Sequence, residues 1–154
     1  TLHKRGVRIR ILGTRRNLSE DMLTLLQHVE TTTKDNTKFS LNIAFNYGGR
    51  DEIVRAARRI AQDLKDGNIG YEKFTEAGFA QYLDTDGLPD PDLVIRTSGE
   101  TRISNFLLWQ AAYAEFVFSD VLWPDFSQND LLEAIKIFQN RERRFGNLKS
   151  IGVA

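Results

Sequence analysis

The segment RTSGETRIS, residues 96–104, places charged and hydroxyl side chains at nearly every position. Arg96 and Arg102 can form charge-assisted hydrogen bonds with phosphate oxygens, and Ser104 adds a hydroxyl group. Gly99 would let a ligand approach the backbone closely. These residue types predict a cradle of diphosphate size. The alternative is a surface loop whose arginines pair with nearby carboxylates such as Glu100, and the pattern alone leaves both open.

A carboxylate follows this segment at Glu115, between the apolar residues Tyr113 and Phe116. Beside a diphosphate, a carboxylate would share a Mg²⁺ ion with it, because Mg²⁺ takes one or two carboxylates together with phosphate oxygens. The competing interpretation is a charge at a strand edge that is paired with another side chain.

Two further polar segments are candidates for a site. NYGGRDE, residues 46–52, includes Asn46 and Arg50 and follows an apolar run. NRERRFG, residues 140–146, is strongly basic, and the simplest explanation is favourable placement of positive charge at the end of a helix.

Strands and helices must alternate along the chain to position these loops. Apolar patterns predict strands at residues 7–12, 39–45, 93–96 and 116–118. Helical spacing and capping residues predict helices at residues 18–33 (capped by Ser19), about 53–64, 75–83, 104–113 (capped by Ser104) and 127 to about 145, where Ser127 and Asp130 form a capping-box pattern.

This alternation predicts an α/β fold, a mostly parallel β-sheet flanked by helices on both faces. In such sheets, ligands bind beyond the carboxyl ends of the strands. Residues 46–52 and 96–104 each follow a strand and should therefore lie at that edge.

Composition limits the class of protein. The chain has 154 residues, 41% of them hydrophobic, and a formal net charge of zero. We therefore expect one domain, residues 1–154, and no nucleic-acid partner. Cysteine is absent, and the two histidines, His3 and His28, lie far from the polar segments, which argues against Ser–His or thiolate–metal chemistry. Without an apolar run long enough to span a bilayer or a visible signal peptide, we expect a cytoplasmic protein.

The long motif DLVIRTSGETRISNFLLWQAAYAEFVFSDVLWPDF, together with NRERRFG, closely resembles the cis-prenyltransferase family, most nearly its bacterial undecaprenyl diphosphate synthases. LNIAFNYGGRDEI matches a second segment of that family. The resemblance implies that Arg96, Arg102 and Ser104 bind the diphosphate of isopentenyl diphosphate. It also implies that the family's undecaprenyl diphosphate synthase-like fold applies here.

The same resemblance assigns further residues. It implies that Glu115 is catalytic and holds Mg²⁺, and that Arg144 and Gly146 reach the partner subunit's site in a homodimer. Asn46 and Arg50 correspond to a glycine-rich loop near the site.

The implied reaction condenses isopentenyl diphosphate onto an allylic diphosphate such as farnesyl diphosphate. The product would be a long-chain polyprenyl diphosphate, undecaprenyl diphosphate for the cell-wall lipid carrier, released with transient contact at the membrane surface. Nothing in residues 1–154 resembles the family's HxxxDGNxRWA element, which binds the allylic substrate. We therefore expect this chain to be the carboxyl-terminal two-thirds of such an enzyme, with the amino-terminal part missing, and to be inactive alone. A noncatalytic partner subunit and an unrelated phosphate-binding α/β module are the alternatives.

Overall fold

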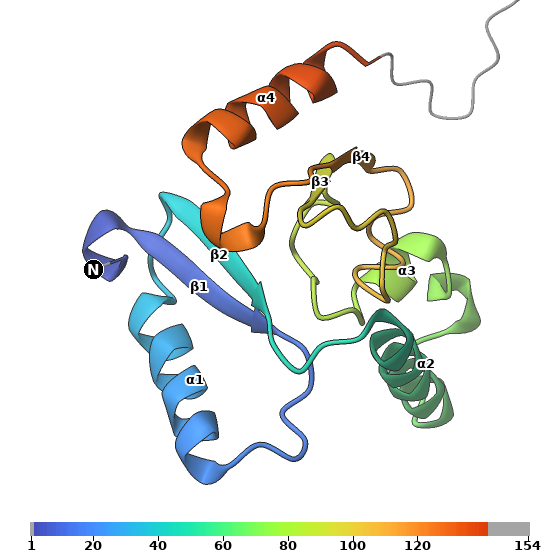
Figure 1. The fold of residues 1–154 in the computed structure, drawn as a ribbon. Helices are drawn as coiled ribbons and strands as arrows, with labels where there is room; N and C mark the ends of the chain where they lie inside the picture. The colour runs from blue at the N-terminus through green and yellow to red at the C-terminus, as the bar shows by residue number, and fades with distance from the viewer. Residues whose placement is uncertain (1, 142–154) are drawn as a thin grey trace, which may run out of the picture. The chain divides into compact units, whose positions relative to one another are not determined.

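The structure, a computed structural model, describes residues 2–141 (Figure 1). The chain divides into two compact units, Thr1–Pro89 and Asp90–Ala154. In the described residues, each unit carries one pair of parallel strands with helices beside it. The expected α/β fold with parallel strands is confirmed. A single catalytic domain over residues 1–154 stays a prediction.

The first unit is built around strands β1 and β2, which pair in parallel from Val7 opposite Phe39 to Leu12 opposite Ala44. Its elements are the 3₁₀ helix η1 (His3–Arg5), β1 (Val7–Leu12), α1 (Glu20–Thr33), β2 (Phe39–Ala44), α2 (Gly49–Lys65), the 3₁₀ helix η2 (Tyr71–Lys73) and α3 (Glu76–Ala80).

Helix α1 covers the edge of β1 that β2 leaves open. The backbone N–H of Ile9 donates to Thr33 Oγ1 at 3.0 Å, and that of Ile11 donates to Glu30 Oε1 at 2.8 Å. An uncovered strand edge would present unpaired N–H groups to other chains. Side chains of α1 therefore accept the hydrogen bonds of Ile9 and Ile11 along this edge of β1.

The second unit is built around β3 (Leu93–Arg96) and β4 (Glu115–Phe118), parallel strands that begin with Leu93 opposite Glu115 and end with Arg96 opposite Phe118. The 3₁₀ helix η3 (Trp123–Asp125) and helix α4 (Gln128–Gln139) follow, and α4 packs on β4. Ser127 Oγ accepts from the N–H of Asp130, and the Asp130 carboxylate accepts from the N–H of Ser127, so the predicted capping box is confirmed.

The predicted helix at residues 104–113 is wrong. That segment forms a series of turns, because Ser104, Asn105 and Leu107 have φ angles of 48°, 63° and 44°. Left-handed backbone cannot continue a right-handed helix, so Ser104 caps no helix here.

Other elements differ from the sequence-based predictions in where they end or in which residues they bury. Helix α3 ends at Ala80 rather than near residue 83, and α4 ends at Gln139 rather than near residue 145. Helix α2 buries Glu52, Ala56 and Ile60, whereas its apolar residue Val54 is 48% exposed.

Candidate functional site

A pocket of about 200 Å³ in the second unit brings Arg96 and Arg102 together. Its walls come from both strands and from the polar loop: Val94, Ile95, Arg96, Arg102, Ile103, Phe106, Phe116 and Phe118. Two arginines therefore line one cavity together with phenylalanine residues. The Phe116 and Phe118 rings are themselves stacked, with centroids 6.0 Å apart.

Ser104 joins this group through Arg96, whose Nη2 donates to Ser104 Oγ at 3.4 Å. This hydrogen bond is long, so a stronger acceptor such as a phosphate oxygen would compete with it well. Arg102 forms an ion pair with Glu100, and its side chain is 69% exposed. The three residues predicted for the cradle are thus neighbours, and the pairing with Glu100 that the surface-loop alternative predicted is also present.

The backbone of the polar loop is held by the segment that follows β4. The N–H of Ser98 donates to the Val121 carbonyl and the N–H of Gly99 donates to the Ser119 carbonyl, at 2.9 and 3.0 Å. These two amides are consequently turned toward the protein rather than toward a ligand. Gly99 adopts a left-handed φ of 66°, which explains the glycine better than close approach of a ligand does.

Strained backbone accumulates beside the two arginines. Non-glycine residues with positive φ are uncommon, and each costs of order 1–3 kcal/mol where it is held in place. Ser98, Ser104, Asn105 and Leu107 all have positive φ within ten residues of the chain. Such strain clusters at functional sites, which supports a functional role for this loop.

Glu115 lies at the other end of the strand pair. It is the first residue of β4, three residues before Phe118, which is opposite Arg96. That separation is roughly 10 Å at about 3.3 Å per residue. Its Oε2 accepts from Arg141 Nη1 at 2.9 Å, and the same Arg141 nitrogen donates to the Phe116 carbonyl at 2.7 Å. The structure therefore gives Glu115 an arginine partner that its sequence position did not reveal.

No three His, Cys, Asp or Glu side chains gather as a metal site within residues 2–141. Glu115 offers a single carboxylate, which suits a Mg²⁺ ion that takes most of its ligands from phosphate and water. Arg144 and Gly146 lie outside the described residues.

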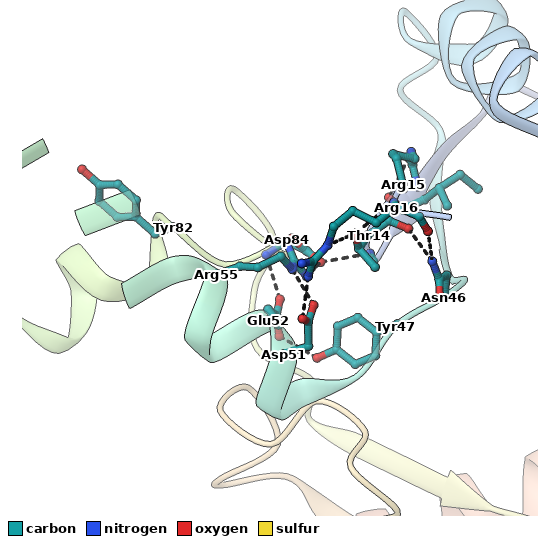
Figure 2. A network of polar contacts seen from close by, with 12 residues as sticks. Thr14, Arg15, Arg16, Asn46, Tyr47, Asp51, Glu52, Arg55, Tyr82 and Asp84 are labelled. Atoms are coloured by element: carbon teal, nitrogen blue, oxygen red, sulfur yellow. Dashed lines mark hydrogen bonds and ion pairs between the residues drawn. The ribbon is translucent and has the colours of Figure 1, made fainter. Parts of the chain in front are cut away.

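Asn46 and Arg50 belong to the first unit, where the loops after β1 and β2 meet (Figure 2). Asn46 Nδ2 donates to the carbonyl oxygens of Thr14 and Arg16, both at 3.0 Å, and the Asn46 carbonyl accepts from the N–H of Thr14. A Cβ at Gly13 would overlap the Phe45 carbonyl oxygen. Asn46 therefore fastens the two loops together, while Arg50 lies in the first turn of α2.

An arginine and two aspartates, none of them among the predicted site residues, anchor this junction. Arg55 Nη1 and Nη2 donate to Asp84 Oδ1 and Oδ2 at 2.8 and 2.7 Å, and Arg55 Nε donates to Asp51 Oδ2 at 2.7 Å. Figure 2 shows the Arg55 guanidinium between the two carboxylates. The four-residue spacing of Asp51 and Arg55 on a helix is the sequence feature that could have indicated their ion pair.

These contacts shift the pKa values of all three groups. The hydrogen bond from Arg55 lowers the pKa of Asp51. Burial alone would raise the pKa of Asp84, but the hydrogen bonds and charge of Arg55 outweigh burial and lower it. The hydrogen bonds to Asp84 raise the pKa of Arg55 still further above its usual value. All three side chains are therefore charged at neutral pH.

Glu52 is fully buried beneath this junction. Its carboxyl group accepts from Tyr47 Oη at 2.6 Å and from the N–H of Asp84 at 2.7 Å. A buried polar group is costly unless it is hydrogen-bonded. Glu52 thus links the loop after β2 to the segment that carries Asp84.

None of the helices in residues 2–141 is both long enough and apolar enough to cross a bilayer.

Comparison with known proteins supports the family resemblance that the motifs indicated. The family model described as "Putative undecaprenyl diphosphate synthase" matches residues 1–146. The chain is 52% identical over 147 residues to an isoprenyl transferase of Agrobacterium fabrum, across 96% of this chain and 60% of that protein. It is 47% identical to a ditrans,polycis-undecaprenyl-diphosphate synthase ((2E,6E)-farnesyl-diphosphate specific) of Legionella pneumophila, across 96% of this chain and 62% of that protein.

The fold is also found among solved structures. Lavandulyl diphosphate synthase from Lavandula x intermedia, in complex with dimethylallyl diphosphate, matches 92% of this chain and 61% of its own, with a TM-score of 0.87 and 38% identity. The chain therefore spans about 60% of the length of the relatives that it matches.

Proposed function

This chain belongs to the undecaprenyl diphosphate synthase family of cis-prenyltransferases, and we propose that the whole protein condenses isopentenyl diphosphate onto an allylic diphosphate. The name of the Legionella pneumophila relative supports farnesyl diphosphate as the allylic substrate and undecaprenyl diphosphate as the product. Family membership removes the unrelated phosphate-binding module as an alternative. A noncatalytic partner subunit is the hypothesis that an activity assay must eliminate.

The pocket that Arg96 and Arg102 share with phenylalanine rings carries this proposal. Isopentenyl diphosphate has an anionic head and a short branched hydrocarbon tail. Two guanidinium groups and the Ser104 hydroxyl suit the head, since guanidinium matches phosphate oxygens in a bidentate manner. Phe106, Phe116 and Phe118 suit the tail. A sugar phosphate, by contrast, would leave its hydroxyl groups against an aromatic wall.

Positioning and charge neutralisation would supply most of the catalysis. In the condensation, the C1–O bond of the allylic diphosphate breaks and the diphosphate leaves with the electron pair. The C4 carbon of isopentenyl diphosphate bonds to that C1, and loss of a proton from C2 forms the new double bond. Arg96 and Arg102 would hold the isopentenyl diphosphate still, with its alkene directed away from its own charge.

Glu115 would hold Mg²⁺ together with diphosphate oxygens and water, and the bound ion would neutralise phosphate charge. To serve in this way, the Glu115 carboxylate must give up part of its hydrogen bonding with Arg141.

The same proposal includes the oligomeric state of the protein. We expect a homodimer in which Arg144 and Gly146 approach the partner's site. Tyr113 and Phe118 support this, because they are 75% and 45% exposed and aromatic residues are enriched at interfaces. Cytoplasmic placement and transient contact with the membrane surface stay predictions.

Steady-state kinetics of the full-length protein test the proposal. Arg96→Ala or Arg102→Ala should raise the KM for isopentenyl diphosphate or lower kcat/KM by about ten- to a hundred-fold, since a hydrogen bond to a charged group contributes about 1.5–3 kcal/mol. Arg58→Ala is the matched control, because the exposed Arg58 side chain has no hydrogen-bond or ion-pair partner within residues 2–141. Unchanged kinetics in both pocket variants contradict the assignment, and an inactive wild-type protein supports the noncatalytic subunit.

A further inference from the structure

We propose that Arg55 and Asp84 are positioning residues, which hold residues 46–50, the loop after β2 together with the first two residues of α2, in the geometry that the reaction needs. This inference rests on the proposed function, because only the family resemblance behind that function implies a role in the reaction for Asn46 and Arg50. Neither residue is expected to touch substrate. Their effect would pass through Asp51, Arg16 and Asn46 (Figure 2).

The contacts around Arg55 close into a ring. Asp84 Oδ2 accepts from the N–H of Gly13 at 3.0 Å, at the start of the loop after β1. On the other side of Arg55, Asp51 Oδ1 accepts from Arg16 Nη2 at 2.7 Å, at the end of the same loop. The backbone from Gly13 to Arg16 closes the ring, so these contacts hold the loop of residues 13–16 at both ends.

The two halves of the ring differ in how far their side chains are exposed to solvent. The side chains of Arg55 and Asp84 are 20% and 13% exposed, whereas those of Asp51 and Arg16 are 43% and 59% exposed. Ion pairs that are shielded from water are screened less by salt than exposed pairs. The Arg55–Asp84 pair is therefore the fixed part of the ring, and Arg16–Asp51 is the part that solvent can open.

The loop of residues 46–50 depends on this ring for its shape. Asn46 has a left-handed φ of 51°, a conformation that persists only where the surroundings hold it. Its side chain donates hydrogen bonds to the carbonyl oxygens of Thr14 and Arg16, which lie in the loop of residues 13–16. At its other end, the loop runs into the first turn of α2, which carries Asp51. Loss of Arg55 would therefore loosen both ends of the loop.

A purely stabilising ion pair is the competing explanation, and it makes a different prediction. It would lower the stability of the whole unit without changing residues 46–50 in the folded protein. The positioning role requires a local change in the folded state, together with a loss of kcat/KM at a temperature where every variant is folded.

Full-length Arg55→Gln, Arg55→Lys and Arg58→Gln proteins test this, with hydrogen exchange and steady-state kinetics measured on each. We expect Arg55→Gln to speed amide exchange in residues 13–16 and 46–51 and to lower kcat/KM by about ten- to a hundred-fold, the range found for displaced catalytic geometry. Arg55→Lys should fall between Gln and wild type, because lysine keeps the charge but cannot bond Asp51 and both Asp84 oxygens at once. Arg58→Gln, on the same helix, should match wild type.

Two results would overturn the inference. Exchange in residues 13–16 and 46–51 that is the same in Arg55→Gln and Arg58→Gln shows that the ring does not order the loops, whether or not the wild type has condensation activity. Faster exchange with unchanged kcat/KM, in an active enzyme, shows that the loop needs no positioning. Absence of condensation by the wild type refutes the proposed function instead, and the exchange data then decide the ordering of the loops alone.

Discussion

Replacing Asp84 with asparagine should destabilise the first unit by about 2–4 kcal/mol. The Asp84 carboxylate accepts three hydrogen bonds, two from Arg55 and one from the N–H of Gly13. Asparagine keeps one oxygen acceptor and turns an NH₂ group toward these donors. Breaking a buried ion pair costs about 3–5 kcal/mol, but this pair is partly exposed and Arg55 retains Asp51, so the expected cost is smaller.

The destabilisation should depend on pH in a defined direction. The pKa of Asp84 in the folded protein lies below its ordinary value, because the hydrogen bonds from Arg55 outweigh the effect of burial. A carboxyl group of this kind contributes fully above its unfolded pKa of about 3.9, and the contribution is lost as the pH falls through the folded pKa. The difference between wild type and Asp84→Asn should therefore be largest near neutral pH and should shrink below about pH 4.

Urea unfolding of the full-length protein, followed by circular dichroism between pH 3 and pH 7, measures both effects. Asp35→Asn is the control, since the exposed Asp35 side chain has no hydrogen-bond or ion-pair partner within residues 2–141. The reasoning is refuted if Asp84→Asn changes the free energy of unfolding by no more than the control does, or if its effect grows as the pH falls.

Three further predictions concern assembly, completeness and local stability. Sedimentation of the full-length protein should give a dimer at micromolar concentration, built largely from the segment after Ser104 that carries Trp109 and Tyr113; a monomer contradicts this. Residues 1–154 alone should show no condensation of labelled isopentenyl diphosphate with farnesyl diphosphate and Mg²⁺, because holding only one reactant forfeits most of the roughly 7–11 kcal/mol that proximity supplies; transfer of label into an apolar phase would refute this. Ser127→Ala should cost about 1 kcal/mol of stability through loss of the α4 cap, and an unchanged melting temperature would show that the cap contributes nothing.

Short-range patterns were sufficient to locate most of the elements. Strand β1 has the predicted bounds, Ser19 caps α1 by accepting from the N–H of Met22, and Ser127 with Asp130 caps α4. The alternation of apolar and polar residues and the capping of helices involve only a few neighbouring residues, so the local sequence is enough to predict them. Arg96, Arg102 and Ser104 were also predictable as neighbours, because they share one short loop at the carboxyl end of a strand.

The segment after Ser104 marks the limit of that reasoning. Its composition suits a helix, yet three residues with positive φ turn it into successive turns. The loop before it is tied to the segment after β4 through Ser98 and Gly99. These long-range ties outweigh helix propensity, which differs among ordinary residues by less than about 1 kcal/mol per residue.

The long-range charge pairs depended on tertiary structure altogether. Asp84 is 29 residues from Arg55, and Glu115 is 26 residues from Arg141. The sequence contained each charged residue and the family motif, and these determined what chemistry the chain can carry. Which arginine meets which carboxylate depends on how loops far apart along the chain are folded against one another, because an ion pair requires its atoms within about 4 Å. Only the tertiary structure decided that Arg55, rather than its exposed neighbour Arg58, closes the ring around the loops of the first unit.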